Sequence, residues 1–463
     1  MSDAVATSQQ GLAGKYKPYP EYKDSGVEWL QLCPSSWETK ALKYIVSCND
    51  EVLSESTDPD MEFEYIDIGG VSSSEGITRT ESMRFSGAPS RARRIVRQGD
   101  IIVSTVRTYL EAIAPISLEF DGKIASTGFA VLRPKYLLSG FAQYALRARH
   151  FIDSVVARST GVSYPAINSS ELIDIKIVVP SLKEQQTIAA FLDYETARID
   201  RLIAQQQRLI ELLKEKRQAV ISHAVTKGLN SNAPMKESGV EWLGQVPEHW
   251  VVTKLSRLVF MQEGPGLRTW QFTDEGTRVI CVTNITESGI DFSRLQKYIS
   301  TEEYMSSYRH FKVKQGDILI SSSGNSWGKV AEYYGNNEVI LNTSTIRVNV
   351  LSGNPLIRGF IKLYLQSVGC REQLGLAMTG ACQPNFGPSH LKEVFSPVPP
   401  QNEQNEIVRY ITDATSTFAR TIGVCEATVA LLQERRTTVI SAAVTGKIDL
   451  RGWTPPTDNE VTA

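Results

Sequence analysis

The sequence predicts an α+β protein built as a tandem internal repeat. Two mixed α/β globular units are joined by two long helices, which form an antiparallel coiled coil with pseudo-twofold symmetry. Two observations predict this fold class: several motifs occur twice in the same order, and each globular segment is followed by about 45 residues with the apolar spacing of a long helix. The composition, with 41% hydrophobic and 22% charged residues, is that of an ordinary globular protein.

Self-comparison places the second copy about 219 residues after the first. The shared motifs are Ser-Gly-Val-Glu-Trp-Leu followed by Pro and Trp (the Trp motif) at 25–37 and 238–250, Gln-Gly-Asp-Ile (the Gly-Asp-Ile motif) at 98–101 and 315–318, and Pro-x-x-x-Glu-Gln (the Glu-Gln motif) at 180–185 and 399–404. Residues 179–226 align without a gap on 398–445, with 18 identical pairs in 48. Two copies are too few for a solenoid, so we expect a pair of similar units.

The globular segments contain short β-branched runs separated by Gly, Asn and Ser, which is typical of strands. These runs are 101–106, 175–179, 279–283, 318–321 and 339–341. One stretch, 141–158, has a helical pattern instead. Each globular segment is therefore expected to be a mixed α+β domain.

Residues 182–226 contain neither Gly nor Pro and place apolar side chains alternately four and three positions apart. The expected seam residues are Ile188, Leu192, Ile199, Leu202, Leu209, Leu213 and Val220 in the first copy, and Ile407, Ile411, Ala414, Phe418, Cys425, Leu432 and Val439 in the second. Such helices reach roughly 65 to 70 Å and must bury their apolar stripe. The equivalent helix of the other repeat is the most available partner. If each globular unit relates to its own helix in the same way, the two helices pair antiparallel around a pseudo-twofold axis. The alternative, a single core helix of a compact domain, is disfavoured by the length.

These features divide the chain into seven segments. They are an N-terminal extension at 1–24, a first globular domain at 25–178, a central helix at 179–228, a linker at 229–237, a second globular domain at 238–397, a distal helix at 398–446 and a C-terminal tail at 447–463. No apolar run of about 18 residues, signal-peptide pattern or CxxC pair occurs. We therefore expect a cytoplasmic protein without membrane contact.

Common catalytic and cofactor-binding motifs are missing from the sequence. Residues 324–330 superficially resemble a P-loop, but the glycines are one residue too close and Val330 stands where Ser or Thr would hold magnesium. The five histidines never fall at the four-residue spacing of helical metal ligands. We expect a non-catalytic chain that binds no cofactor and no metal.

A basic stretch from Arg79 to Tyr109 carries seven arginines against two acidic residues, in a chain whose net charge is −2. Arginine suits the clamping of phosphates and the bidentate reading of guanine. The candidate DNA-binding residues here are Arg91, Arg93, Arg94 and Arg107. The alternative is a solvated surface whose arginines pair with acidic residues elsewhere in the chain.

Two loops in each copy hold further candidates. One follows the Gly-Asp-Ile strand, and the other, at 160–167 and 379–386, keeps Thr-Gly and Pro in register. The candidates are Arg107, Tyr109 and Tyr164 in the first copy, and Asn325, Trp327, Lys329, Gln383 and Asn385 in the second. Hydrogen-bond donors beside a stacking side chain are the groups that read base edges. An ordinary hairpin and a plain helix-to-strand connection are the alternatives.

This ordered double set of motifs resembles the specificity subunit of a type I restriction-modification system. The resemblance extends over about residues 18–450 and includes Val-Ile-Ser-x-Ala-Val-Thr at 220–226 and 439–445. It implies two target-recognition domains, each reading one part of a bipartite double-stranded DNA site, held on antiparallel spacer helices. Base-contacting residues vary within the family, so it transfers loop positions and no individual contacts.

The resemblance also implies partners. These are two modification subunits, which carry the methyltransferase activity and flip an adenine, and restriction subunits, which are motor-nucleases. S-adenosylmethionine, ATP and magnesium would then be bound by those partners. Two other functions stay open: recognition domains fused to a self-contained DNA methyltransferase or nuclease, which the chain length disfavours, and a duplicated scaffold that binds only protein.

Overall fold

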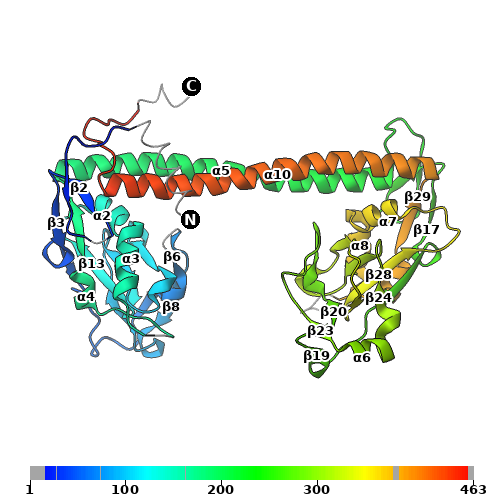
Figure 1. The fold of residues 1–463 in the computed structure, drawn as a ribbon, viewed down its shortest axis with the longest axis horizontal. Coiled ribbons are helices and arrows are strands. Elements are labelled where there is room, and N and C mark those ends of the chain that lie inside the picture. Colours follow the sequence, from blue (N-terminus) through cyan, green and yellow to red (C-terminus); the bar gives the residue numbers. More distant parts are fainter. Residues whose placement is uncertain (1–15, 28, 73–74, 162, 379–384, 457–463) are drawn as a thin grey trace. The chain divides into compact units, whose positions relative to one another are not determined.

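The computed structural model describes residues 16–27, 29–72, 75–161, 163–378 and 385–456. They fall into two compact units. Unit 1 contains the chain up to residue 206 together with residues from 427 onward, and unit 2 contains 207–426. Because both boundaries lie inside long helices, each of these helices contributes one part to each unit (Figure 1).

Two sheets form the globular part of unit 1, in the orders β11-β10-β13-β4 and β8-β5-β12-β9. Their strands are β4 (Val46–Cys48), β5 (Glu62–Ile66), β8 (Glu81–Arg84), β9 (Ala92–Ile95), β10 (Ile101–Ser104), β11 (Ile113–Pro115), β12 (Ile124–Ser126) and β13 (Phe129–Pro134). β10 is buried throughout, and its alternate residues enter different cores: Ile101 and Val103 pack in one, Ile102 in the other. The predicted run 101–106 therefore forms a strand, which ends at Ser104.

Unit 2 repeats this topology with sheets in the orders β18-β28-β25-β26 and β19-β23-β20-β27-β24. The strands are β18 (Val259–Glu263), β19 (Phe272–Thr273), β20 (Thr277–Ile280), β23 (Tyr298–Ile299), β24 (Lys312–Val313), β25 (Ile318–Ser321), β26 (Val330–Glu332), β27 (Val339–Leu341) and β28 (Thr345–Val350). β25 pairs with β28 and β26 as β10 pairs with β13 and β11, and the parallel pair β5 and β12 recurs as β20 and β27. The predicted strands 318–321 and 339–341 match β25 and β27, whereas the run 279–283 leaves the sheet after Ile280.

Smaller strand pairs complete both units. They are β1 (Tyr22–Asp24) with β2 (Leu32–Pro34), β3 (Glu38–Ala41) with β14 (Lys176–Val179), β6 (Val71–Ser72) with β7 (Gly76–Ile77), β15 (Met235–Glu237) with β16 (Gln245–Pro247), β17 (Val251–Lys254) with β29 (Phe395–Val398), and β21 (Ile285–Thr286) with β22 (Gly289–Ile290). The pairs β3–β14 and β17–β29 lead directly into the long helices, so each helix leaves its globular domain from a sheet.

The predicted single helix at 141–158 is wrong. The chain forms two helices there, α2 (Ser139–Ala145) and α3 (Arg149–Arg158), and Ala148 between them is extended, with a ψ of 145°. Both Leu146 and Ala148 are buried at the break, so tertiary packing overrides residues that by themselves tolerate a helix. The break recurs between α7 (Arg358–Leu365) and α8 (Val368–Ala377). The short helices α4 (Ser169–Ile173), α6 (Thr301–Glu303) and α9 (Pro388–Glu393) complete the set in the described residues.

The two long helices are α5 (Leu182–Lys227) and α10 (Gln401–Val444). In unit 1 the beginning of α5 shares a core with the end of α10, and Arg436 Nε lies 2.8 Å from Asp200 Oδ1. In unit 2 the end of α5, at Ile221, shares a core with the beginning of α10, at Ile407. The predicted antiparallel pairing is therefore present in each unit, where the two helices lie side by side (Figure 1).

The seam of α10 follows the prediction, with Ile407, Ile411, Cys425 and Val439 buried. The seam of α5 differs at two predicted positions, because Leu202 and Leu209 are 38% and 40% exposed. Their neighbours Ile203 and Ile210 are half-buried instead. Each pair offers two adjacent apolar residues, so the four-and-three spacing fits either of them. Packing between the helices buries the second residue of each pair more than the first.

The shared motifs anchor these helices. Trp37 Nε1 donates to Glu184 Oε1 at 3.2 Å, and the equivalent Trp250 Nε1 donates to Glu403 Oε2 at 2.9 Å. Gln185 Oε1 accepts from the backbone N–H of Leu138 at 2.8 Å, and Gln404 makes the equivalent bond to Ile357 at the same distance. The Trp and Glu-Gln motifs are therefore structural: they tie the first turn of each long helix to its globular domain.

Candidate nucleic-acid interface

In unit 1 the two predicted loops lie against each other. Val106 and Ala166 form an antiparallel bridge, and Ile167 N donates to Thr105 O at 2.9 Å. The hydroxyl oxygens of Thr108 and Ser159 are 2.7 Å apart. The structure thus brings 104–109 together with 160, 161 and 163–167 into one surface, which we call the unit 1 reading surface.

Arg107, Tyr109 and Tyr164 belong to this surface. Arg107 has a positive φ of 51° and leads into a short helical turn, Thr108–Leu110. Its guanidinium lies over the Tyr164 ring at 4.9 Å from the centroid. Tyr109 is 54% exposed. A stacked arginine held in an uncommon backbone conformation, beside two exposed aromatic rings, is suited to contact bases or phosphates.

Unit 2 has the equivalent surface, formed by 322–329 and the residues after 384. Phe386 N donates to Ser322 O at 3.1 Å, and Ser323 bridges Asn385. Asn325 is exposed, while Trp327 and Lys329 are half-buried. The structure therefore brings Asn325, Trp327, Lys329 and Asn385 onto neighbouring segments; Gln383 lies outside the described residues.

The basic stretch does not form one cluster of free arginines. Several of its members pair with acidic residues, as the alternative interpretation expected. These ion pairs are Arg79–Glu81 at 2.7 Å, Arg84–Glu62 at 3.1 Å, Arg91–Asp67 at 3.4 Å and Arg97–Glu51 at 2.6 Å. Arg93 lies over the Phe85 ring at 4.6 Å from the centroid, and Arg94 Nε is buried.

Arg91 is the member of the stretch that the backbone links to the reading surface. Thr127 N donates to Arg91 O at 2.7 Å, and the next residue, Gly128, accepts from Thr105 N at 2.8 Å. Arg93 and Arg94 lie further along β9. Of the four predicted arginines, Arg107 therefore belongs to the unit 1 reading surface, and Arg91 is linked to it through the backbone.

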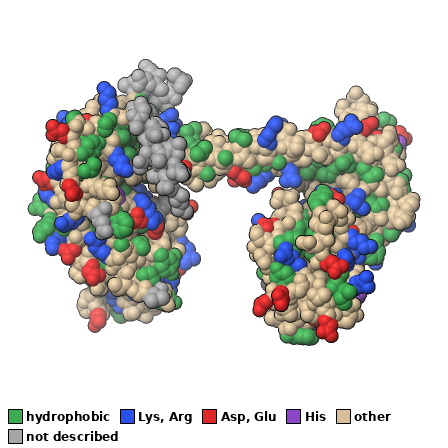
Figure 2. Space-filling model, viewed as in Figure 1, with side chains coloured by type: hydrophobic (Ala, Val, Ile, Leu, Met, Phe, Trp, Pro, Cys, Tyr) green, Lys and Arg blue, Asp and Glu red, His purple; other side chains and the backbone are tan. Residues whose placement is uncertain are grey.

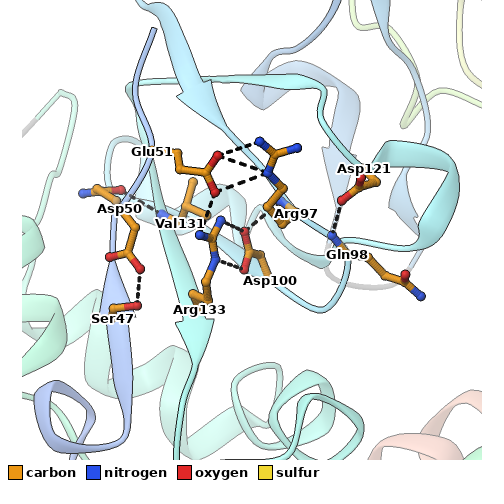
Figure 3. A network of polar contacts seen from close by, with 10 residues as sticks. Ser47, Asp50, Glu51, Arg97, Gln98, Asp100, Asp121, Val131 and Arg133 are labelled. Carbon is orange, nitrogen blue, oxygen red and sulfur yellow. Dashed lines mark hydrogen bonds and ion pairs between the residues drawn. The ribbon is translucent and has the colours of Figure 1, made fainter.

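The aspartate of the Gly-Asp-Ile motif has a structural role (Figure 3). Asp100 is 1% exposed and accepts from Arg133 Nε and Nη2, both at 2.9 Å, and from Arg97 N at 2.8 Å. Arg133 also reaches Glu51 at 2.7 Å. Hydrogen bonds from Arg97 and Arg133 lower the pKa of Glu51 to about 2. This network joins two sheets and uses Arg97 within the fold.

The equivalent aspartate in unit 2 is Asp317, which is 5% exposed. It accepts from Lys314 N and from Asn349 Nδ2, both at 2.8 Å. Arg347 Nη1 lies 3.4 Å away. Both copies therefore use the motif to hold the turn that precedes the central strand, and so to position the reading loop that follows that strand.

Side chains that gather at the reading surface from distant segments were not singled out by the sequence analysis. Arg371 of α8 lies over the Trp327 ring at 5.2 Å from its centroid. It is separated from that loop by more than 40 residues, so no local pattern could have indicated it. Within the described residues there is no group of three potential metal ligands, and no helix has the length and apolar character needed to cross a membrane.

Comparisons with known proteins agree with this architecture. The model of the family described as "Type I restriction modification DNA specificity domain" matches residues 34–212 and 247–422. The MjaVIII specificity subunit of Methanocaldococcus jannaschii is 24% identical over 56% of this chain and 60% of its own length. The EcoBI specificity subunit of Escherichia coli is 25% identical over 56% of each chain. The chain thus spans somewhat over half the length of these relatives.

A solved structure has the same fold. It comes from work on complex assembly and conformational transition of the type I restriction-modification system, and it superposes with a TM-score of 0.70 at 20% sequence identity. The match covers 90% of this chain and 99% of that one. Since the family model matches both repeats and more than half of the residues, the chain belongs to the family of type I restriction-modification DNA specificity domains.

Proposed function

We propose that this chain is the sequence-specific DNA-binding subunit of a type I restriction-modification complex. One observation carries the proposal: the same surface is built twice on the same frame, with different side chains in the two copies. Unit 1 presents Arg107, Tyr109 and Tyr164, whereas unit 2 presents Asn325 and Trp327. Two surfaces with different contacts read two different half-sites, which together make a bipartite target.

The contacts follow from the chemistry of these groups. Arg107 carries a planar guanidinium that fits the O6 and N7 atoms of guanine or a phosphate. Its stacking on Tyr164 reduces the freedom that it would lose on binding. In unit 2, the amides of Asn325 and Asn385 suit adenine, and Trp327 offers a stacking face.

Catalysis belongs to other subunits in this proposal. Two modification subunits would supply S-adenosylmethionine-dependent adenine methylation, and restriction subunits would supply ATP- and magnesium-dependent translocation and cleavage. The names of the relatives, which are specificity subunits of type I restriction enzymes, support this division. The chain would direct those activities to the target by binding it.

The test is selection of DNA by the chain assembled with its modification subunits. From a pool of randomised duplexes, we expect enrichment of two short conserved blocks separated by a gap of constant length. Enrichment of no sequence would contradict the proposal and favour the protein-binding scaffold. Methyl transfer from labelled S-adenosylmethionine by the chain alone would favour the fused enzyme instead.

Arg107→Ala should relax one position in one block and weaken binding of the selected target by about 1 to 3 kcal/mol, since one bidentate base contact is lost. The matched control is Arg79→Ala, which removes an exposed arginine paired with Glu81 in the same unit. The control should leave the selected sequence unchanged. Equal effects of both changes would show that Arg107 makes no specific base contact.

A further inference from the structure

A small cavity in unit 2 collects positive charge from three separate segments. It has a volume of about 50 Å³, and its basic residues are Arg217 of α5, Lys329 of the reading loop and Arg371 of α8. The carboxylate that lines it is Glu287, which lies 3.8 Å from Arg217. The Glu287 side chain is 68% exposed, so solvent screens its charge. The cavity is therefore lined by three cations and by one carboxylate whose charge solvent screens.

The cavity adjoins the unit 2 reading surface. Arg371 lies over the Trp327 ring, and Gly328 passes beside its guanidinium. Gly328 has a φ of +76°, and a Cβ there would be 3.2 Å from Arg371 Nε. A glycine thus lets the reading loop and Arg371 approach each other closely. Any ligand in this cavity would lie next to whatever Trp327 contacts.

Unit 1 has a cavity at the equivalent place, with a volume of about 210 Å³. Its basic residues are Arg147, Arg149 and Arg436. Arg436 of α10 stands 219 positions after Arg217 of α5, which is the repeat offset. Arg147, by contrast, is matched by Gln366. Arg149 in unit 1, and Lys329 and Arg371 in unit 2, also stand at positions that carry no cation in the other copy. Each cavity nevertheless contains three cations.

We propose that each cavity binds one backbone phosphate of the DNA, beside the half-site that its reading surface contacts. This inference deepens the proposed function and rests on it. Each cavity keeps three cations although only Arg217 and Arg436 occupy matching positions, as a requirement for an anion would explain. Arginine guanidinium groups and a lysine ammonium are the side chains that proteins use to hold phosphate.

The long helices gain a role in binding from this arrangement. Arg217 belongs to the helix of the first repeat, but it completes the cavity of unit 2. Arg436 likewise belongs to the second repeat and completes the cavity of unit 1. Phosphate contacts set the register of a protein on the duplex, so each helix would fix how the neighbouring reading loop meets the bases.

The unit 2 cavity should contribute more to affinity. In unit 1, Arg149 is paired with Glu111 at 2.7 Å and with Asp153 at 2.6 Å, and Arg436 is paired with Asp200. These carboxylates already neutralise much of the charge there. Burial and the nearby charge of Arg436 lower the pKa of Arg147, which an arriving anion would oppose.

An acidic side chain of a partner subunit is the competing occupant. The position beside Trp327 and Lys329 favours DNA, because a phosphate there lies next to the bases that the loop would read. Figure 2 shows basic and acidic side chains interspersed over the visible face of each unit.

The experiment compares Arg217→Gln with Lys214→Gln, which removes one exposed cation from the same helix and leaves the cavity intact. Each full-length chain is assembled with its modification subunits, and binding to the selected target duplex is measured over a range of salt concentrations. Arg217→Gln should lower the slope of log affinity against log salt concentration by about 1, since each phosphate contributes about 0.9. Relative to binding at 1 M salt, this corresponds to a loss of about eightfold at 0.1 M and about fourfold at 0.2 M. The sequence preference should not change.

A second series of duplexes carries one neutral methylphosphonate at each position of the half-site read by unit 2. The unchanged chain should lose affinity at one particular phosphate, and Arg217→Gln should be insensitive at that same phosphate. Equal thermal melting of both variants would exclude a folding defect as the cause.

Three results would overturn the inference. If Arg217→Gln and Lys214→Gln gave the same salt slope and the same methylphosphonate profile, the cavity would hold no phosphate while the proposed function stood. If Arg217→Gln weakened assembly with the modification subunits and left the DNA slope unchanged, the occupant would be a partner carboxylate. If the unchanged chain had no target preference at all, the proposed function would fail, and the inference with it.

Discussion

At the residue scale, the polar side chains divide into those that hold the fold and those that remain for a ligand. Asp100 is buried and fully engaged by Arg133 and Arg97, so its charge serves the sheets. Arg107, in contrast, projects from a loop and stacks on an exposed ring. Both types come from the same basic stretch, which is why counting its charges could not separate them.

The Asp100 network predicts a dependence of stability on pH. The pKa of Glu51 is lowered from its ordinary value of 4.5 to about 2 by the two arginines. A carboxylate with a lowered pKa stabilises the folded state above its ordinary pKa, and this contribution is lost as pH falls from about 4.5 toward 2. Glu51→Gln should therefore lower stability at pH 7 and reduce the loss of stability between pH 5 and pH 3.

Urea unfolding followed by tryptophan fluorescence at several pH values measures this effect. The matched control is Glu55→Gln, which neutralises an exposed carboxylate of the same unit. The control should keep the pH dependence of the unchanged chain. An identical pH dependence for Glu51→Gln would mean that the network contributes nothing in solution.

At the element scale, apolar spacing determined that two long helices exist, and packing determined which side chains face inward. Leu202 and Ile203 are equally apolar neighbours, and the crossing of the helices places Ile203 in the seam. Similarly, the chain breaks between α2 and α3 because Leu146 and Ala148 are both buried there. Neither the buried seam residue nor the helix break follows from the helix propensity of the local sequence.

Helix length yields a second prediction. Four residues inserted after Gln206 of α5 add about 6 Å and turn the helix by about 40°, so the seam nearly keeps its facing. If the helices determine the gap between the half-sites, that gap should grow by one or two base pairs, at about 3.4 Å each, while both half-site sequences stay the same. Genome-wide mapping of methylated sites would measure the gap.

A two-residue insertion at the same place is the control. It turns the following helix by about 200°, so its apolar stripe faces solvent and folding should suffer. An unchanged gap with full activity in the four-residue variant would show that helix length does not determine the spacing.

At the scale of the whole molecule, each unit combines the globular domain of one repeat with helix segments from both repeats. The end of α10 packs in unit 1, where Asp449 N donates to Lys17 O at 2.7 Å and Tyr22 donates to Gly446 O at 3.0 Å. The predicted C-terminal tail therefore packs against the first globular domain through Ile448, Leu450 and Trp453. A recognition domain cannot be excised with its own repeat alone, because its core uses the helix of the other repeat.

Exchange of a recognition domain follows from this assembly. Replacing residues 38–178 with the matching domain of a relative keeps Trp37, Glu184 and both helices. We expect the hybrid to change one half of the methylated site and to leave the other half as it was, because in the proposed function each half is read by side chains of a single unit. Site mapping in cells checks this, and a change in both halves would contradict independent reading.

The sequence by itself determined the repeat, the mixed α+β units, the two antiparallel helices and the loops that form the reading surfaces. These features depend on periodicity and on motifs, which are local in the chain or recur at a constant offset. Tertiary structure decided which arginines are consumed by ion pairs, which apolar neighbour enters the seam, and that Arg217 and Arg371 meet beside Trp327. The physical reason is that burial and charge pairing are properties of contacts between distant segments, and such contacts leave no pattern along a single sequence.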